Sequence, residues 1–151
     1  MDIEEYRKDF LEQIRSDAAL NSTDPNDEFI QKIVSLLEEN EEFPDPTIHY
    51  FGSRGKKNRL LQFNAYAFDE ADGSVCLLIS DFSNSEIPVT LTNTQIDSLY
   101  SRMHYFIEEA YTGNIGEYCD DSDLTIDIAR QIRKLIGKSN FESSVLKFKF
   151  F

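Results

Sequence analysis

The chain has 151 residues, of which 40% are hydrophobic, and a formal net charge of −13. Its length predicts a single domain over residues 1–151 with one real core, and its charge argues against a free-standing DNA-binding protein. No apolar run approaches the roughly 20 residues that a membrane helix needs, and the acidic N-terminus, MDIEEYRKDF, is not a secretory signal. The two cysteines have no metal-binding spacing. We therefore expect a cytoplasmic protein with no membrane partner.

The first part of the chain predicts two helices. Apolar residues recur with helical spacing over 2–15, and we expect a connector over 16–27. Within it, Asp24 followed by Pro25 is typical of a helix start, with aspartate as the cap and proline in the first turn. The second helix should end near the acidic, proline-containing stretch 38–46.

Three strands are predicted next. The first is short and covers 47–51, the second covers 59–68, and the third covers 74–82. The sequence DEADG at 69–73 predicts a compact turn, so the last two strands should form an antiparallel hairpin. Cys76 and Leu78 should be buried, because the third strand carries apolar residues on both faces.

The turn also predicts the register of this hairpin. If it centres on residues 71 and 72, the numbers of paired residues add up to 143. Asn64 would then lie opposite Ile79 and Gln62 opposite Asp81, so that the two amides and Asp81 would share one face in a polar corner at the strand end. A slip of one residue would instead bring Ser80 beside the amides.

The rest of the chain predicts two helices and a final strand. A broad apolar stripe follows Thr94 and continues to Ala110, and Ser122 can cap a further helix that Gly137 ends. Residues 145–151 then alternate between apolar and lysine side chains, as a strand does.

The predicted order is therefore ααβββααβ. It indicates an α+β fold with a mixed, mainly antiparallel sheet flanked by helices. Because the sequence stops on Phe150 and Phe151 in mid-strand, we expect this domain to be the N-terminal module of a longer protein.

One short stretch departs from the acidic character of the chain. Residues 1–46 contain 14 acids and 4 bases, whereas 47–59 contain four bases and no acid. The bases are Arg54, Lys56, Lys57 and Arg59. The stretch GSRGKKNR could contact phosphate, but it lacks phosphate-loop spacing and is more simply interpreted as a soluble hairpin loop. Nucleic acid is expected as a partner only through 54–59.

Two segments together resemble a known family. A helix containing DEFIQKIVSLLEE, followed by a hairpin with the sequence FNAYAFDEADGSVCLLISDF, is similar to the N-terminal part of AIPR proteins, the abortive phage infection family. The stretches DDSDLTIDIARQI and SSVLKFKFF fit the same family. The resemblance implies a prokaryotic, cytoplasmic phage-defence protein in which a longer C-terminal region normally follows.

The order of elements also resembles the core of restriction-endonuclease-like nucleases. In that fold a helix Glu, an Asp on the second strand and a Glu-x-Lys on the third hold Mg²⁺, which prefers oxygen ligands. The resemblance implies Glu28 for the helix position and Asp81 for the third strand, but Asn64 stands where the strand Asp is expected. No Glu-x-Lys is present. Glu28, Asn64 and Asp81 are thus the catalytic candidates, and no metal or cofactor is expected unless a Mg²⁺-dependent nuclease site is intact.

Three functions remain open at this point. The first is a phage-defence domain with a degenerate nuclease-like site, which acts in interaction or sensing through its own C-terminal region or a second copy. The second is an active Mg²⁺-dependent nuclease, and the third is a non-enzymatic dimerisation or binding module. Asp81 could also be a solvated acid after the strand, His49 is isolated, and His104 is expected to be partly buried packing.

Overall fold

The computed structural model describes residues 2–142 and 146–151, apart from the side chains of 140–142. Within these ranges the elements are α1 (Ile3–Asn21), α2 (Pro25–Glu39), β1 (Thr47–Arg54), β2 (Leu60–Asp69), β3 (Ser74–Leu78), α3 (Asn93–Thr112), α4 (Leu124–Glu142) and β4 (Lys147–Phe150). Two short 3₁₀ turns, η1 (Lys56–Asn58) and η2 (Ile115–Glu117), lie between them. The predicted α+β class and the order ααβββααβ are confirmed.

The strands form one mixed sheet in the order β1-β2-β3-β4. Strands β1, β2 and β3 are successively antiparallel, and β4 joins β3 in parallel. The pairs Asp69↔Ser74 and Ala65↔Leu78 both add up to 143, so the predicted hairpin and its register are confirmed. Cys76 and Leu78 are buried, as expected.

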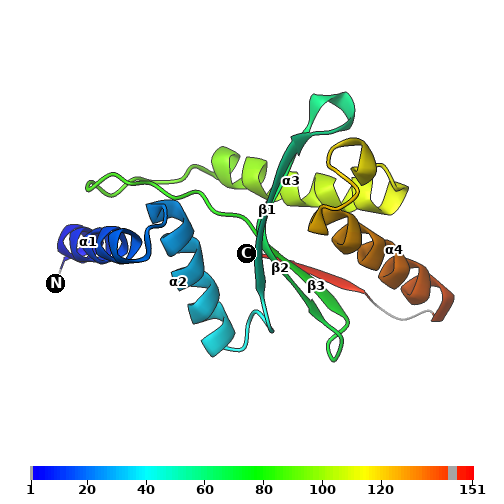
Figure 1. Cartoon of the computed structure of the whole chain (residues 1–151), viewed down its shortest axis with the longest axis horizontal. Coiled ribbons are helices and arrows are strands. Elements are labelled where there is room, and N and C mark those ends of the chain that lie inside the picture. The colour runs from blue at the N-terminus through cyan, green and yellow to red at the C-terminus, as the bar shows by residue number, and fades with distance from the viewer. Residues whose placement is uncertain (1, 143–145) are drawn as a thin grey trace.

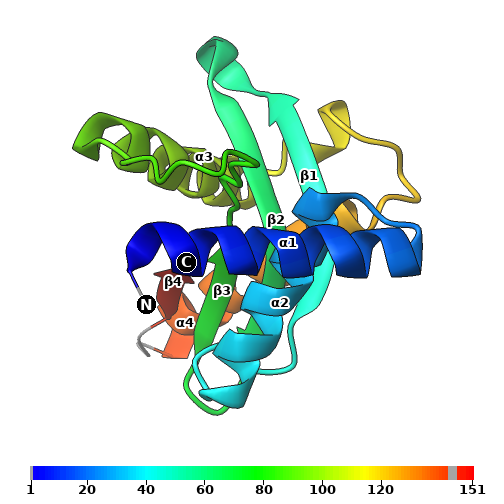
Figure 2. The same cartoon turned by 90° about the vertical axis from the view of Figure 1, so that its left-hand side faces the viewer.

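The sheet separates two helical layers. Figure 1 shows α1 and α2 on one side of the sheet and α3 and α4 on the other, and Figure 2 shows α1 crossing in front of it. The larger core, on the α3 and α4 side, is built around Phe63, whose ring centroid lies 4.8 Å from that of Phe106. The smaller core lies beneath α2 and includes the fully buried Phe43. None of the described helices is long and apolar enough to cross a membrane.

Several predicted helix boundaries are wrong. Helix α1 continues through residues 16–21, where Ala18 is buried, and ends at Ser22 in the left-handed conformation. Helix α4 passes through Gly137, where an added Cβ would have no neighbouring atom within 4 Å, so this glycine faces open space. A helix tolerates such a glycine at about 1 kcal/mol. Asp123, rather than Ser122, accepts the hydrogen bond from the Thr125 backbone N–H at the start of α4.

Other boundaries agree with the sequence patterns. The Asp24 side chain accepts a hydrogen bond from the backbone N–H of Asn26, and Pro25 occupies the first turn of α2, as predicted. Helix α3 begins one residue before Thr94, because Thr92 forms a capping box with Gln95.

The strand lengths differ from the prediction. Strand β1 extends beyond 47–51 to Arg54, and β3 ends at Leu78 rather than at residue 82. The Ile79 backbone N–H still donates to the carbonyl oxygen of Phe151 at 3.0 Å, so the chain leaves the sheet just after this contact. Strand β4 occupies 147–150 of the predicted 145–151, and residue 145 lies outside the described residues.

Candidate functional site

Glu28, at the helix position implied by the nuclease resemblance, lies in the first turn of α2 and faces the turn between α1 and α2. Its Oε1 accepts hydrogen bonds from the Thr23 hydroxyl at 2.6 Å and from the Asn21 amide at 3.0 Å. The residue is buried, and these two donors, Thr23 first, hold the pKa of Glu28 below its ordinary value. The carboxylate therefore closes the turn between two helices.

Asn64 fixes the end of the central hairpin. It is 5% exposed, and its Oδ1 accepts a hydrogen bond from the Ser80 backbone N–H at 2.9 Å. Asn64 also lies where the β1–β2 register shifts, between the pairs Ile48↔Ala65 and Phe51↔Phe63. The Asn64 amide thus holds the backbone at Ser80, just beyond the end of β3.

Asp81 and Gln62 do not pair as predicted, because β3 ends at Leu78. Asp81 is exposed, whereas the Gln62 Oε1 accepts a hydrogen bond from Arg102 of α3 at 2.9 Å. The predicted polar corner formed by the two amides and Asp81 is therefore wrong. A register slipped by one residue would have brought Ser80 beside the amides. The register is the predicted one, yet it is the Ser80 backbone N–H that donates to Asn64.

The three candidate positions do not fit a magnesium site. The oxygen of Glu28 is engaged in its turn, the Asn64 oxygen binds a backbone N–H, and Asp81 is exposed. In the described parts of the chain, no group of three or more His, Cys, Asp or Glu side chains could hold a metal ion. Burial raises the pKa of the Cys76 and Cys119 thiols, which disfavours the reactive thiolate form.

The four bases of the cluster at 54–59 have different surroundings. The Arg59 guanidinium lies 4.1 Å from the centre of the Tyr105 ring and 3.1 Å from the Glu108 carboxylate. Arg54 is exposed but donates to the Asn58 carbonyl oxygen at 2.9 Å. Lys56 and Lys57 are exposed. Arg59 is thus a packing residue, and the other three bases face solvent.

Glu109 organises this loop and was missed by the sequence analysis. It is only 1% exposed, and its Oε1 accepts a hydrogen bond from the Lys56 backbone N–H at 2.6 Å. Burial, and then the nearby Glu109 carboxylate, raise the pKa of Tyr118. A signal was present in the sequence, because Glu109 follows the core residue Phe106 by three positions and so lies on the buried stripe of α3.

His49 joins β1 to the first turn of α4. Its Nε2 lies 2.9 Å from the Thr125 hydroxyl and 3.2 Å from the Asp123 carboxylate. A nucleophile–His–Asp relay needs one ring nitrogen for each partner, whereas here one nitrogen faces both, and Thr125 is fully buried. The cluster is therefore structural. His104 is exposed beside Glu108, so its predicted partial burial is wrong.

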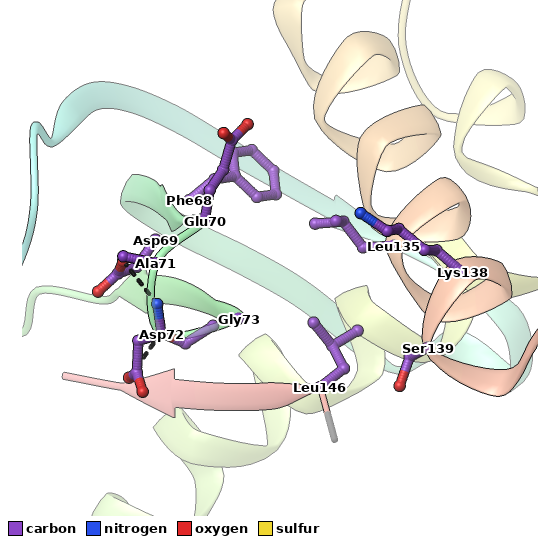
Figure 3. A pocket seen from close by; sticks show the side chains of 11 residues that line it. Phe68, Asp69, Glu70, Ala71, Asp72, Gly73, Leu135, Lys138, Ser139 and Leu146 are labelled. Carbon is purple, nitrogen blue, oxygen red and sulfur yellow. Dashed lines mark hydrogen bonds between the residues drawn. The ribbon is translucent and has the colours of Figure 1, made fainter. Parts of the chain in front are cut away.

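An open hollow of about 560 Å³ lies between the β2–β3 turn and the end of α4 (Figure 3). Phe68, Leu135 and Leu146 line it, and Lys138 lies at its edge. Its volume is in the range of small-molecule sites. The polar groups nearest to the β2–β3 turn stabilise that turn, since the Asp69 carboxylate accepts a hydrogen bond from the Asp72 backbone N–H at 3.1 Å.

Asp72 fastens this turn to β4. Its carboxylate accepts hydrogen bonds from the ammonium groups of Lys149 at 2.5 Å and Lys147 at 3.3 Å. Lys149, then Lys147, lower the pKa of Asp72 to about 2. The turn and the final strand thus form one unit at this end of the sheet.

These features define an α+β domain with a mixed sheet and polar side chains that mainly fix its strand ends and turns. The sequence model of the family described as the abortive infection phage resistance protein N-terminal domain matches residues 29–151. The chain therefore belongs to this family, as the helix and hairpin motifs predicted. No similarity to a curated protein or to a solved structure was found.

Proposed function

We propose that this domain is an interaction or sensing module of an abortive-infection phage-defence protein, built on a nuclease-like fold whose site is degenerate. The observation that carries the proposal is the use of Glu28 and Asn64 in structural hydrogen bonds, together with the exposure of Asp81. Mg²⁺ needs several oxygen ligands around one point, and in the described residues no group of three or more His, Cys, Asp or Glu side chains could hold a metal ion.

The order of elements supports the nuclease-like part of the proposal. From α2 onward, the chain forms, in order, a helix, three strands, a helical region and a last strand. This last strand, β4, is the edge strand next to β3. This is the order on which the resemblance to restriction-endonuclease-like cores rests. A fold can be retained while its site changes, so the order gives no argument for cleavage.

Protein contact is the proposed mode of action, with the C-terminal region of the same protein or a second copy as the partner. Residues 79–92 connect β3 to α3 and include three exposed apolar side chains, Ile87, Val89 and Leu91, at alternate positions. Arg7 of α1 donates to the carbonyl oxygens of residues 83 and 85 and so holds this connection. Apolar groups that gather on a surface favour protein interaction.

Two measurements test the proposal. The purified chain should not cleave DNA or RNA with Mg²⁺ or Mn²⁺, whereas metal-dependent cleavage that Asp81→Ala abolishes would establish the nuclease alternative. Light scattering should detect self-association, or a complex with the C-terminal region of the full-length protein. A strict monomer that binds neither would refute the proposed mode of action.

A further inference from the structure

The turn between β1 and β2 forms a ribbon that extends past the rest of the sheet. Strand β3 pairs only with residues 65–69 of β2, whereas residues 51–54 of β1 pair with 60–63. The part of the sheet next to this turn therefore consists of β1 and β2 alone. Figure 1 shows the turn at the top of the molecule, beyond the end of the sheet and away from α2.

The tip of this ribbon, residues 54–59, is held in one shape. Glu109 is buried beneath it and binds the Lys56 backbone N–H. A Cβ added to Gly55 would overlap the Glu109 carboxylate, so no larger residue fits there without a shift. Lys57 and Asn58 are both left-handed, with φ of 57° and 60°. Left-handed backbone at a non-glycine residue costs free energy and persists only where the surrounding structure holds it, as the hydrogen bond to Glu109 does here.

The tip presents positive charge to solvent. Lys56, Lys57 and Arg54 are exposed, and residues 47–59 contain no acid. The acids of residues 1–46 belong largely to α1, α2 and the turn before β1. That turn lies at the opposite end of β1, about 26 Å away for eight residues at roughly 3.3 Å each. Charges are screened over about 8 to 10 Å at physiological salt, so the acids of that turn do not reach the tip. The acids next to the tip belong to α3: Glu108 is paired with Arg59, and Glu109 is buried beneath Lys56. The four bases of residues 54–59 outnumber these two carboxylates.

We propose that the tip, residues 54–59, binds duplex DNA by entering the major groove and contacting the phosphate backbone through Lys56, Lys57 and Arg54. The major groove admits a two-stranded β-ribbon, which is the form of the structure at this point. Duplex RNA does not fit, because its major groove is deep and narrow. The inference is independent of the proposed protein contacts, since it concerns a different part of the surface.

The proposed contact involves few phosphates, and its affinity depends on the salt concentration. With two or three phosphates neutralised, the affinity should fall about 10- to 40-fold between about 50 mM and about 200 mM salt. Because the contacts are to phosphate, the affinity should be similar for duplexes of different sequence.

Fluorescence anisotropy with a labelled DNA duplex of about 20 base pairs at about 50 mM salt tests the inference on the full chain. The double variant K56E/K57E should weaken binding by at least about tenfold. The control K134E/K138E changes the net charge by the same amount, and its two lysines are exposed on α4. That control should alter the affinity by less than about twofold, a difference that general charge repulsion would not produce.

A second variant tests the shape of the tip without changing any charge. Gly55→Ala brings a methyl group against the Glu109 carboxylate and should weaken binding, while circular dichroism shows an unchanged fold. Absence of binding by the wild type at about 50 mM salt would overturn the inference. Equal losses in the two lysine pairs would overturn it too, as would equal affinity for single-stranded DNA or duplex RNA. Each of these results would leave the proposed protein contacts untouched, because light scattering measures them separately.

Discussion

Replacing Asn64 by aspartate restores the carboxylate that the nuclease resemblance expects on the second strand, and we expect this change to destabilise the protein without producing cleavage. The Ser80 backbone N–H would still find an acceptor, since Oδ1 is retained. The substitution therefore keeps the hydrogen bond and the shape of the side chain, and it adds one negative charge at a position that is 5% exposed.

The size of the effect follows from the burial of that charge. Burial raises a carboxyl pKa by up to 3 to 5 units in fully buried sites, and a hydrogen bond from an N–H offsets part of this rise. A net rise of about 1 to 2 units corresponds to a loss of roughly 1.4 to 2.7 kcal/mol at neutral pH. For a chain of this size each kcal/mol lowers Tm by about 2 to 4 °C, so the expected decrease is on the order of 5 °C.

The pH dependence of the stability difference shows whether the added charge stabilises or destabilises the protein. A carboxyl group whose pKa is raised in the folded state destabilises the protein above that pKa, and the penalty disappears below the unfolded value of about 3.9. Urea unfolding at about pH 7.5 and about pH 4.5 should therefore show a smaller difference between variant and wild type at the lower pH. Asn84→Asp is the matched control, because Asn84 is exposed and accepts a hydrogen bond from Arg15. Equal stability of the Asn64 variant and the wild type at the higher pH would show that the site is hydrated and the reasoning wrong.

Three further changes test the fold. Asp72→Asn should reduce stability above about pH 4, and the difference from the wild type should shrink as pH falls toward 2. The reason is that the wild type loses its lysine pairs as pH falls through the Asp72 pKa of about 2. Thermal unfolding from about pH 5 to pH 2 measures this difference, and a constant gap would contradict it. Phe63→Ala should cost about 3 to 5 kcal/mol, since the side chain is fully buried, whereas Tyr50→Ala, at a residue 63% exposed, should cost less than about 1 kcal/mol in the same urea titration. Thr92→Ala removes the cap of α3 and should cost about 1 kcal/mol by the same measurement, with no loss if α3 starts elsewhere.

The sequence predicted those parts of the fold that depend on neighbouring residues. The aspartate–proline pair at the start of α2 and the turn at 69–73 are local signals, and both gave correct boundaries and the correct register. The ends of α1 and α4 depend instead on tertiary packing. Ala18 is buried and extends α1, and an exposed Gly137 does not outweigh the contacts of the residues around it.

The candidate site shows the same limit. Glu28 lies on the helix named by the resemblance, yet its hydrogen-bond partners come from the segment before that helix, where no spacing rule indicated them. Asp81 was interpreted as part of a strand because an apolar run precedes it, and the strand ends three residues earlier. The role of Glu109 depends on a loop more than 50 residues away in the chain, a separation that helix periodicity does not register.

The parallel pairing of β3 with β4 has a consequence for synthesis of the protein on the ribosome. Strand β3 ends at Leu78 and its neighbour β4 ends at Phe150, so 150 − 78 = 72 residues must be added before the sheet can close. At about 5 to 20 residues per second this takes roughly 4 to 14 s. Strand β3 is buried along its whole length in the finished protein. Throughout that interval, however, one of its edges is unpaired and can pair with other nascent chains.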